Sequence, residues 1–307
     1  MEDNNYTYKR LEEKYLPDLK IIFRDVFNKE VSINYLRNKY NTDYLGVSFI
    51  SFMAFHNNKA VAFYGAIPQK FRSETQTFLV AHACDSFTRQ EHQKKGLHYN
   101  LAIRAYELMR KYDIKFVYAF HSENTFHSTK KLEWKNHLNM KRFHINIFTL
   151  PISKVCIKLK LQNIYHRFLS IYLKKIIVDK SNFKSETTKG EIYNEAFFDY
   201  KDGFNNHFLL LIENSYFYIK IDEIMRVGFF KCSNDIDFKK AIIKLKKIAF
   251  VLGINEILFQ VSPNTMQFNY LNKLLSPKDS WLIGYLMFCE DLKFSDFEFT
   301  YANLDTF

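Results

Sequence analysis

The stretch from residue 78 to residue 120 constrains the fold more than any other part of the sequence. Residues 78–85 are apolar and extended in character, and they end at a polar loop that leads to Gly96. A helix with an apolar stripe follows, and residues 115–120 again have the composition of a strand. This order is that of a β-α-β unit whose loop lies at the N-terminus of the helix. The sequence therefore predicts an α/β protein.

Regular elements are expected on both sides of this unit. The first 45 residues carry apolar side chains at helical spacing, and residues 47–55 and 59–69 have the pattern of a β-hairpin. A second mixed region begins at residue 191. We expect it to contain strands at 208–212, 216–221, 227–231 and 256–261 and a helix over about 238–252.

The two halves of the sequence resemble each other at an offset of 140 residues. Residues 113–125 then lie over residues 253–265 without a gap, and four of the aligned positions are identical. Each segment follows an expected helix and consists of a strand that ends in a Ser-x-Asn-Thr loop. This shared context predicts a duplication. The loop of the second half that corresponds to Gly96 has no glycine and two carboxylates, so an anion site is expected in the first half only.

Several classes of protein are excluded by composition and motifs. The chain has only 8 Gly and 5 Pro, and it contains neither the G-x-G of dinucleotide-binding loops nor the G-x-x-x-x-G-K of P-loops. No apolar run approaches the length of a membrane helix, and the polar N-terminus is not that of a secretory signal. Four scattered cysteines without a C-x-x-C pair predict no metal site and favour a cytoplasmic protein with reduced thiols. They are Cys84, Cys156, Cys232 and Cys289.

Positive charge is concentrated in one segment. The net charge is +11, and residues 151–190 contain nine Lys and Arg against only two acidic residues. Binding of nucleic acid therefore does not follow from the overall charge. We expect residues 151–183 to form an amphipathic connector with solvated lysines. Contact of this stretch with an anionic membrane surface, or with an anionic substrate such as a nucleotide sugar, is the alternative that its composition leaves open.

The loop before the central helix has the chemistry of a pyrophosphate site. The first amides of a helix have no intrahelical acceptor, Gly96 permits close approach of the backbone, and Lys94 and Lys95 add positive charge. From Cys84 through this loop and helix to the strand that ends before Asn124, the sequence resembles the Gcn5-related N-acetyltransferases (GNAT). The resemblance covers residues 6–148, and residues 191–307 resemble a degenerate second copy.

This resemblance implies two GNAT-like domains in tandem, each an α/β (α+β) fold with a central mixed β-sheet flanked by helices. The expected divisions are an N-terminal domain with the acyl-CoA site (1–150), a basic amphipathic connector (151–190) and a degenerate C-terminal domain (191–307). In the family, backbone amides at the start of the helix hold the pyrophosphate of coenzyme A, and the pantetheine arm enters a gap between two splayed strands. The residues implied in binding acetyl-CoA or another acyl-CoA are Ser86, Phe87, Gln93, Lys94, Lys95, Gly96, Leu97, His98 and Asn124.

The sequence departs from the family pattern at two positions of this region. His98 stands where the family has Gly or Ala, and Glu133 stands where it has Gly before the aromatic Trp134. The tyrosine that many members use as a general acid is absent from residues 125–134.

The implied reaction is direct transfer of an acyl group from a thioester to a small amine, such as an amino sugar of polysaccharide synthesis, within a ternary complex. The amine must lose a proton to attack, so a base is needed. Asp85, His121 and His82 are the candidates, although each also fits a structural role. Two other interpretations stay open: an aminoacyl-tRNA-dependent aminoacyltransferase of the kind that builds peptidoglycan bridges, and a non-catalytic acyl-CoA-binding or scaffold protein.

Overall fold

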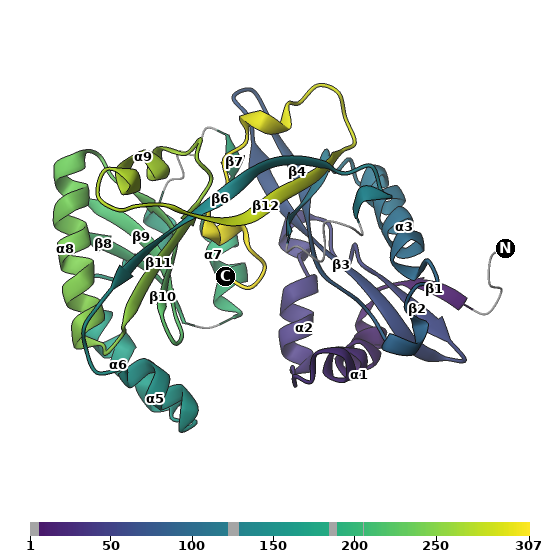
Figure 1. Cartoon of the computed structure of the whole chain (residues 1–307), viewed down its shortest axis with the longest axis horizontal. Helices are drawn as coiled ribbons and strands as arrows, with labels where there is room; N and C mark the ends of the chain where they lie inside the picture. Colours follow the sequence, from purple (N-terminus) through teal and green to yellow (C-terminus); the bar gives the residue numbers. More distant parts are fainter. Residues whose placement is uncertain (1–5, 122–128, 184–188, 205) are drawn as a thin grey trace. The chain divides into compact units, whose positions relative to one another are not determined.

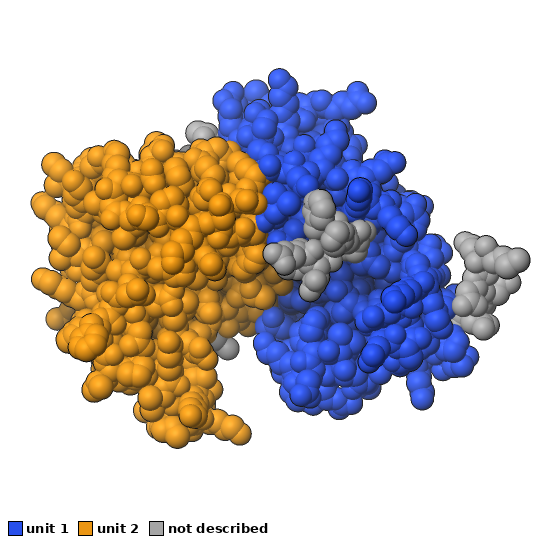
Figure 2. Space-filling model, in the orientation of Figure 1, with its two compact units in different colours: residues 1–137, 188–192, 282–297 blue, residues 138–187, 193–281, 298–307 orange. Residues whose placement is uncertain are grey.

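The structure is a computed structural model of the whole chain, and it describes residues 6–121, 129–183, 189–204 and 206–307 (Figure 1). The chain divides into two compact units, which Figure 2 distinguishes by colour. Unit 1 comprises residues 1–137, 188–192 and 282–297, and unit 2 comprises residues 138–187, 193–281 and 298–307. The boundaries at 150 and 190 expected from the sequence stay a prediction.

Unit 1 is built on a mixed β-sheet with the strand order β1-β2-β3-β4-β5-β12. All neighbouring strands in it are antiparallel except β4 and β5, which are parallel, and the short β7 pairs with β3. Of β12, the part from Leu282 to Met287 pairs with β5. The strands are β1 (Tyr6–Arg10), β2 (Phe52–His56), β3 (Lys59–Arg72), β4 (Thr77–Thr88), β5 (Phe116–His121), β7 (Gly190–Glu191) and β12 (Lys278–Met287).

Helices cover both faces of this sheet. Adjacent residues of a strand point to opposite faces, and in β3 Phe63 contacts the ring of Tyr40 from α2 whereas Tyr64 contacts Tyr106 from α3. Thus α1 and α2 lie on one face and α3 lies on the other. The helices of unit 1 are α1 (Leu16–Phe27), α2 (Ile33–Tyr40) and α3 (Leu97–Lys111), with 3-10 turns η1 (Glu13–Tyr15), η2 (Asp43–Leu45), η3 (Gln90–His92) and η5 (Phe294–Asp296).

Burial of one apolar stripe explains the position of α3. Leu97, Leu101, Ala105 and Met109 recur at intervals of four residues, and all of them are buried against the sheet. Such spacing places the side chains on a single face of a helix. The N-terminus of α3 is thereby fixed at the end of the loop that follows β4.

Unit 2 has strands in the order β6-β11-β10-β9-β8. Its pairs are antiparallel except β10 and β11. The strands are β6 (Lys135–Asn146), β8 (His207–Ile212), β9 (Ser215–Ile221), β10 (Met225–Lys231) and β11 (Glu256–Val261). The helices are α5 (Ile152–Lys158), α6 (Gln162–Leu173), α7 (Glu195–Asp202), α8 (Asp235–Val251) and α9 (Met266–Asn272), with 3-10 turns η4 (Lys180–Asn182) and η6 (Tyr301–Asn303).

The predicted β-α-β unit is confirmed as β4, α3 and β5, and the second mixed region is confirmed as β8 to β11 with α8. The prediction was wrong at residues 47–51. Only Phe52–His56 is a strand there, because the backbone turns at Phe49, whose φ is +51°. Tyr6–Arg10, predicted within a helical region, is instead an edge strand paired with β2.

The 140-residue offset is reproduced by the element boundaries. The helix α3 ends at Lys111 and α8 ends at Val251, and the strands β5 and β11 begin and end at equivalent positions. The duplication itself stays a prediction.

An extra residue in β4 interrupts its pairing with β3. Phe63 pairs with Phe87 and Gly65 pairs with Cys84, so two residues of β4 lie opposite Tyr64 alone. A β-bulge of this kind bends the strand and redirects its side chains. Gly65 is required beside it, because a Cβ at this position would lie 2.7 Å from the carbonyl oxygen of Cys84 and 3.0 Å from the hydroxyl of Tyr40.

We therefore expect Gly65→Ala to lower the free energy of unfolding by about 1–3 kcal/mol, since backbone must shift to admit the methyl group. Urea denaturation of the wild type and the variant measures this. A double-mutant cycle with Tyr40→Phe should show coupling between the two sites, because the Tyr40 hydroxyl is one of the atoms the methyl group meets. An unchanged urea midpoint for Gly65→Ala would contradict the packing described for the bulge.

Candidate active site

The bulge in β4 turns the chain at Asp85. The backbone of this residue has a φ of +42°, in the left-handed region that non-glycine residues rarely adopt. Asp85 and Ser86 are the two residues that face the single Tyr64 of β3. Backbone strain at one position persists when the surrounding structure fixes it, and such positions cluster at functional sites.

Two side chains of α2 hold the carboxylate of Asp85. The Nζ of Lys39 donates to Oδ2 of Asp85 at 2.5 Å, and the hydroxyl of Tyr40 donates to the same oxygen at 2.7 Å. The Lys39 side chain is only 1% exposed, whereas that of Asp85 is 17% exposed. A buried ammonium group requires a charged partner. The ion pair therefore ties α2 to the bulge and stabilises the turned backbone.

Beyond the middle of β4, this strand and β5 separate. They pair in parallel at Ala81 with Val117 and at His82 with Tyr118. From there β4 runs on to Thr88 and β5 runs on to His121, and the described residues make no further ladder between them. The bulge lies on the separated part of β4. Main-chain groups of both strands thus face each other without pairing, next to the loop that leads into α3.

His82, the last residue of β4 that pairs with β5, lies on the α1–α2 face of the sheet. It is 2% exposed, and its ring contacts the rings of Tyr118 and Phe120, with centroid distances of 5.0 and 5.4 Å. The Tyr118 hydroxyl donates to Oε1 of Gln69 at 2.5 Å on the same face. His82 is therefore packed against two aromatic rings, one of which is hydrogen-bonded to the side-chain amide of Gln69.

His121, at the end of β5, lies on the opposite face, toward α3. Its ring contacts Trp134, whose Nε1 donates to the hydroxyl of Tyr106 in α3. The ring covers Gly284 of β12, where a Cβ would lie 1.8 Å from Nε2 of His121. Neither ring nitrogen of this buried side chain is hydrogen-bonded within the described part of the chain. Burial lowers the pKa of His121, which favours the neutral imidazole.

The loop before α3 presents backbone to solvent. Residues 93–96 are exposed, Lys94 and Gly96 have φ values of +62° and +74°, and buried Leu97 anchors the first turn of the helix. Gly96 is the N-cap and has no side chain to accept a hydrogen bond from the amides of that turn. A helix N-terminus of this kind attracts anions through its amides and its dipole.

The other residues implied in coenzyme binding take different positions. Phe87 packs its ring against Phe23 and Phe63 in the core, so it offers a ligand only its backbone, and Ser86 is half-buried in the bulge. His98 turns inward to the ring of Tyr64, and burial lowers its pKa. Asn124 lies outside the described residues.

One of the departures from the family pattern has a structural consequence. Glu133 has a φ of +60°, a conformation that glycine adopts without strain. The residue thus takes a conformation suited to the glycine that the family has at this position.

The structure brings together only some of the candidate bases. Asp85 and His82 lie on the face of β4 that α2 covers, whereas His121 lies on the face that α3 covers. Sequence reasoning missed Lys39 and Tyr40. They lie on a short helix about 45 residues before Asp85, and no motif marks either of them. A lysine and a tyrosine in a helical pattern give no signal of this pairing.

Part of the sequence matches a known family of proteins. Residues 7–135 match the family model described as an acetyltransferase (GNAT) domain. A search of curated proteins finds no match to the sequence.

Solved structures resemble most of the chain. A GCN5-related N-acetyltransferase from Kribbella flavida superposes with a TM-score of 0.61 at 11% identity, covering 92% of this chain and 71% of its own. A putative acetyltransferase from Pyrococcus horikoshii has a TM-score of 0.55 at 14% identity, with coverage of 98% and 95%. N-myristoyltransferase from Saccharomyces cerevisiae, solved with bound myristoyl-CoA and inhibitors, has a TM-score of 0.53 at 10% identity, with coverage of 92% and 79%. The chain therefore has the GNAT fold, and its residues 7–135 match the model of a GNAT acetyltransferase domain.

Proposed function

We propose that unit 1 binds acetyl-CoA or another acyl-CoA and transfers the acyl group to a small amine. The observation that carries this proposal is the bulge at Asp85, which lies on the part of β4 that has separated from β5. It leaves unpaired main-chain groups beside the exposed N-terminus of α3. A ligand with an extended amide-bearing arm and a pyrophosphate matches this combination of groups.

The exposed loop would hold the pyrophosphate. Of the amides from Gln93 to His98, that of Gln93 already donates to the carbonyl of Gln90, so those of Lys94 to His98 are the donors that we propose, and the side chains of Lys94 and Lys95 supply positive charge. The pantetheine amides would pair with the free edges of β4 and β5, with Asn124 near them. Phe87 contributes through its backbone, because its ring is part of the core.

Transfer requires one proton to leave the amine and one to reach the sulfur. The amine nitrogen forms a bond to the thioester carbon, the carbon–sulfur bond breaks, and coenzyme A leaves as its thiol. His121 is our candidate for the proton-transfer group, since burial favours its neutral form and neither ring nitrogen is hydrogen-bonded to a described residue. Asp85 is less suited to this role, because its Oδ2 already accepts hydrogen bonds from Lys39 and Tyr40. We assign Asp85 to holding the bulge, and His82 is the second candidate for proton transfer.

The proposal also includes the acceptor substrate and the cellular compartment of the protein. An amino sugar of polysaccharide synthesis is the acceptor that we propose within the class of small amines. We also propose a cytoplasmic protein, in keeping with four cysteines that are free thiols. Unit 2 is proposed as a degenerate second copy, because its β10, α8 and β11 follow the same order as β4, α3 and β5.

Two other functions remain as outcomes of the experiments. A folded protein that binds acyl-CoA without turnover would be a coenzyme-binding or scaffold protein. One that binds no acyl-CoA would favour an aminoacyl-tRNA-dependent aminoacyltransferase.

Calorimetric titration with acetyl-CoA tests the position of the cofactor. We expect Gly96→Trp to weaken binding by at least about 100-fold, because the indole would cover the amides of the first turn of α3. Gly46→Trp is the matched control: Gly46 has a φ of +75°, has open space around it and lies away from the loop. Equal binding by the wild type and Gly96→Trp would move the coenzyme site away from this loop.

The pH dependence of turnover tests His121. With a panel of amines and detection of free coenzyme A thiol, we expect His121→Gln to lower kcat by about 10²–10⁴-fold. In the wild type the neutral imidazole is the active form, and burial lowers its pKa from 6.5, so activity should fall only below about pH 6.5. This acidic limb should disappear in His121→Gln.

Asp85→Asn is the control variant for the pH dependence of turnover. It should weaken the ion pair with Lys39 and lower stability, and it should leave the acidic limb in place. If His121→Gln retains the limb and Asp85→Asn or His82→Gln removes it, the proton-transfer role belongs to that residue instead.

A further inference from the structure

Unit 2 exposes a large number of apolar side chains in one stretch. Between residues 148 and 177, eleven large hydrophobic side chains are exposed, half of the 22 in the described chain. Phe148 is fully exposed, Ile171 is 74% exposed and Ile164 is 67% exposed. We call residues 146–177 together with residues 244–251 of α8 the basic apolar face. Scattered exposed hydrophobics are ordinary, but a contiguous group marks an interaction surface.

The helix α6 carries two apolar stripes. Tyr165, Leu169 and Leu173 are buried in the core of unit 2, and the Tyr165 hydroxyl donates to the carbonyl of Leu252 at 2.8 Å. A second stripe, on a neighbouring face of the same helix, is open to solvent. It consists of Ile164, Phe168, Ile171 and Tyr172. One stripe accounts for the packing of the helix on its own unit, and the other has no partner within the described chain.

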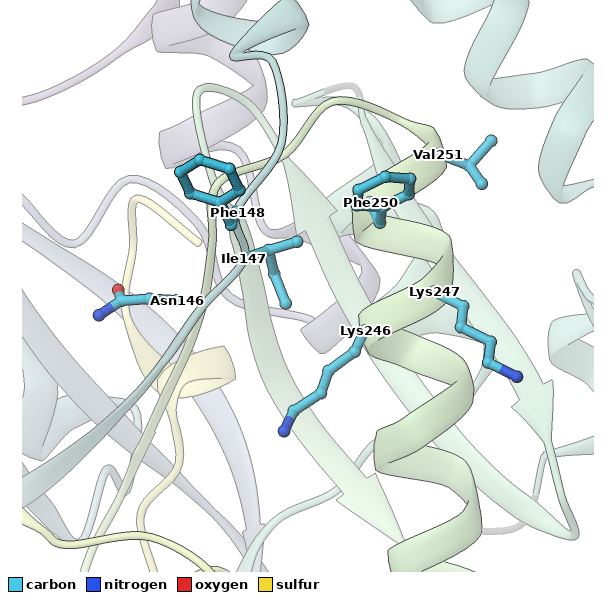
Figure 3. A pocket seen from close by; sticks show the side chains of 7 residues that line it. All are labelled: Asn146, Ile147, Phe148, Lys246, Lys247, Phe250 and Val251. Carbon is cyan, nitrogen blue, oxygen red and sulfur yellow. The ribbon is translucent and has the colours of Figure 1, made fainter.

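The exposed side chains are continuous with the end of α8. Thr149 donates its hydroxyl to the carbonyl of Phe250 at 3.0 Å, and Ile152 packs over Gly253, where a Cβ would lie 2.5 Å from the Cβ of Ile152. A groove of about 490 Å³ lies there, lined by residues 146–148 and by Lys246, Lys247, Phe250 and Val251 of α8. Figure 3 shows that Phe148 and Phe250 come from its two walls.

The two segments that form this face carry only basic charges, although Glu213 pairs with Lys244 at its edge. No acidic residue occurs between Glu133 and Asp179, and none occurs between Asp237 and Glu256. Both segments are rich in lysine, and on the face the basic side chains alternate with the apolar ones. Those of residues 146–177 are Lys154, Lys158, Lys160, Arg167, Lys174 and Lys175, and those of α8 are Lys244, Lys246 and Lys247.

We propose that the basic apolar face docks on the surface of an anionic lipid bilayer. Aliphatic and aromatic side chains would enter the boundary between headgroups and acyl chains, and the long lysine stems would keep their charges at the headgroups. Anionic lipid complements the many lysines of residues 146–177 and 244–251, which contain no carboxylate of their own. Among the described residues no helix has the length and apolarity needed to cross a membrane, so the protein would lie on the bilayer.

Vesicle sedimentation tests the proposal with the full chain. We expect the wild type to pellet with vesicles of phosphatidylcholine and phosphatidylglycerol, to bind vesicles of phosphatidylcholine alone much more weakly, and to be partly released at high salt. Binding that is equal for the two kinds of vesicle, or absent from both, would overturn it.

Double variants on this face, compared with double variants elsewhere on the molecule, test whether this face binds the vesicles. Phe168→Ser/Ile171→Ser should lower the partition constant about 10-fold or more, and Lys174→Glu/Lys175→Glu should lower it about 25-fold or more. The controls Ile236→Ser/Met266→Ser and Lys29→Glu/Lys278→Glu change equally exposed residues away from the face. They should bind as the wild type does, and equal losses in the controls would overturn the assignment to this face.

Fluorescence measures the insertion of the face into the bilayer separately from the binding affinity. A tryptophan introduced as Phe168→Trp should shift its emission to the blue on anionic vesicles and be quenched by brominated lipid. Sedimentation velocity without lipid tests the other occupant, a second copy of this chain. Self-association that Phe168→Ser/Ile171→Ser abolishes, together with no vesicle binding by the wild type, would replace the bilayer with a protein interface.

Discussion

The ion pair between Lys39 and Asp85 is the interaction on which the site in unit 1 depends. The left-handed backbone at Asp85 costs about 1–2 kcal/mol for a non-glycine residue. The buried ammonium of Lys39 and the hydroxyl of Tyr40 offset this cost by binding the same carboxylate oxygen. Because Gly65 has no side chain, the hydroxyl and the carbonyl of Cys84 both fit beside β3. The bulge lies on the part of β4 that no longer pairs with β5, and the main chain there is the part that we propose a ligand contacts.

Much of this architecture could be predicted because its signals are local. The apolar stripe of α3, the glycine before it and the strands on either side lie within about forty residues, and each follows from side-chain spacing or turn chemistry. The strand predicted at 256–261 has the bounds of β11, and the helix predicted over about 238–252 lies within one residue of the end of α8. The same local signals placed the exposed loop from Gln93 to Gly96 at a helix N-terminus.

The remaining features depend on contacts between distant residues. The edge strand β1 is only five residues long, and its pairing with β2 carries no pattern that distinguishes it from a polar helix. Similarly, Gly284 is an ordinary strand residue until the ring of His121 is found lying over it. The pairing of Lys39 with Asp85 and the opposite orientations of His82 and His121 are also set by tertiary packing. The spacing of residues in the sequence does not predict which face of a sheet a helix will cover.

A central strand of each unit has an irregular register, but the side chains around it are polar in unit 1 and aromatic in unit 2. In unit 2 the register between β10 and β9 also shifts, at Gly228, and the parallel pairing of β10 with β11 ends at Val227. There, however, a Cβ on Gly228 would lie 2.4 Å from the ring of Phe307, and that ring belongs to a buried aromatic cluster. The corresponding turn in unit 1 holds a carboxylate, an ammonium group and a hydroxyl. A polar network can bind and orient a polar ligand, so this difference supports the proposal that acyl transfer takes place in unit 1. The aromatic cluster of unit 2 is part of its core. The role that we propose for unit 2 is attachment through the basic apolar face.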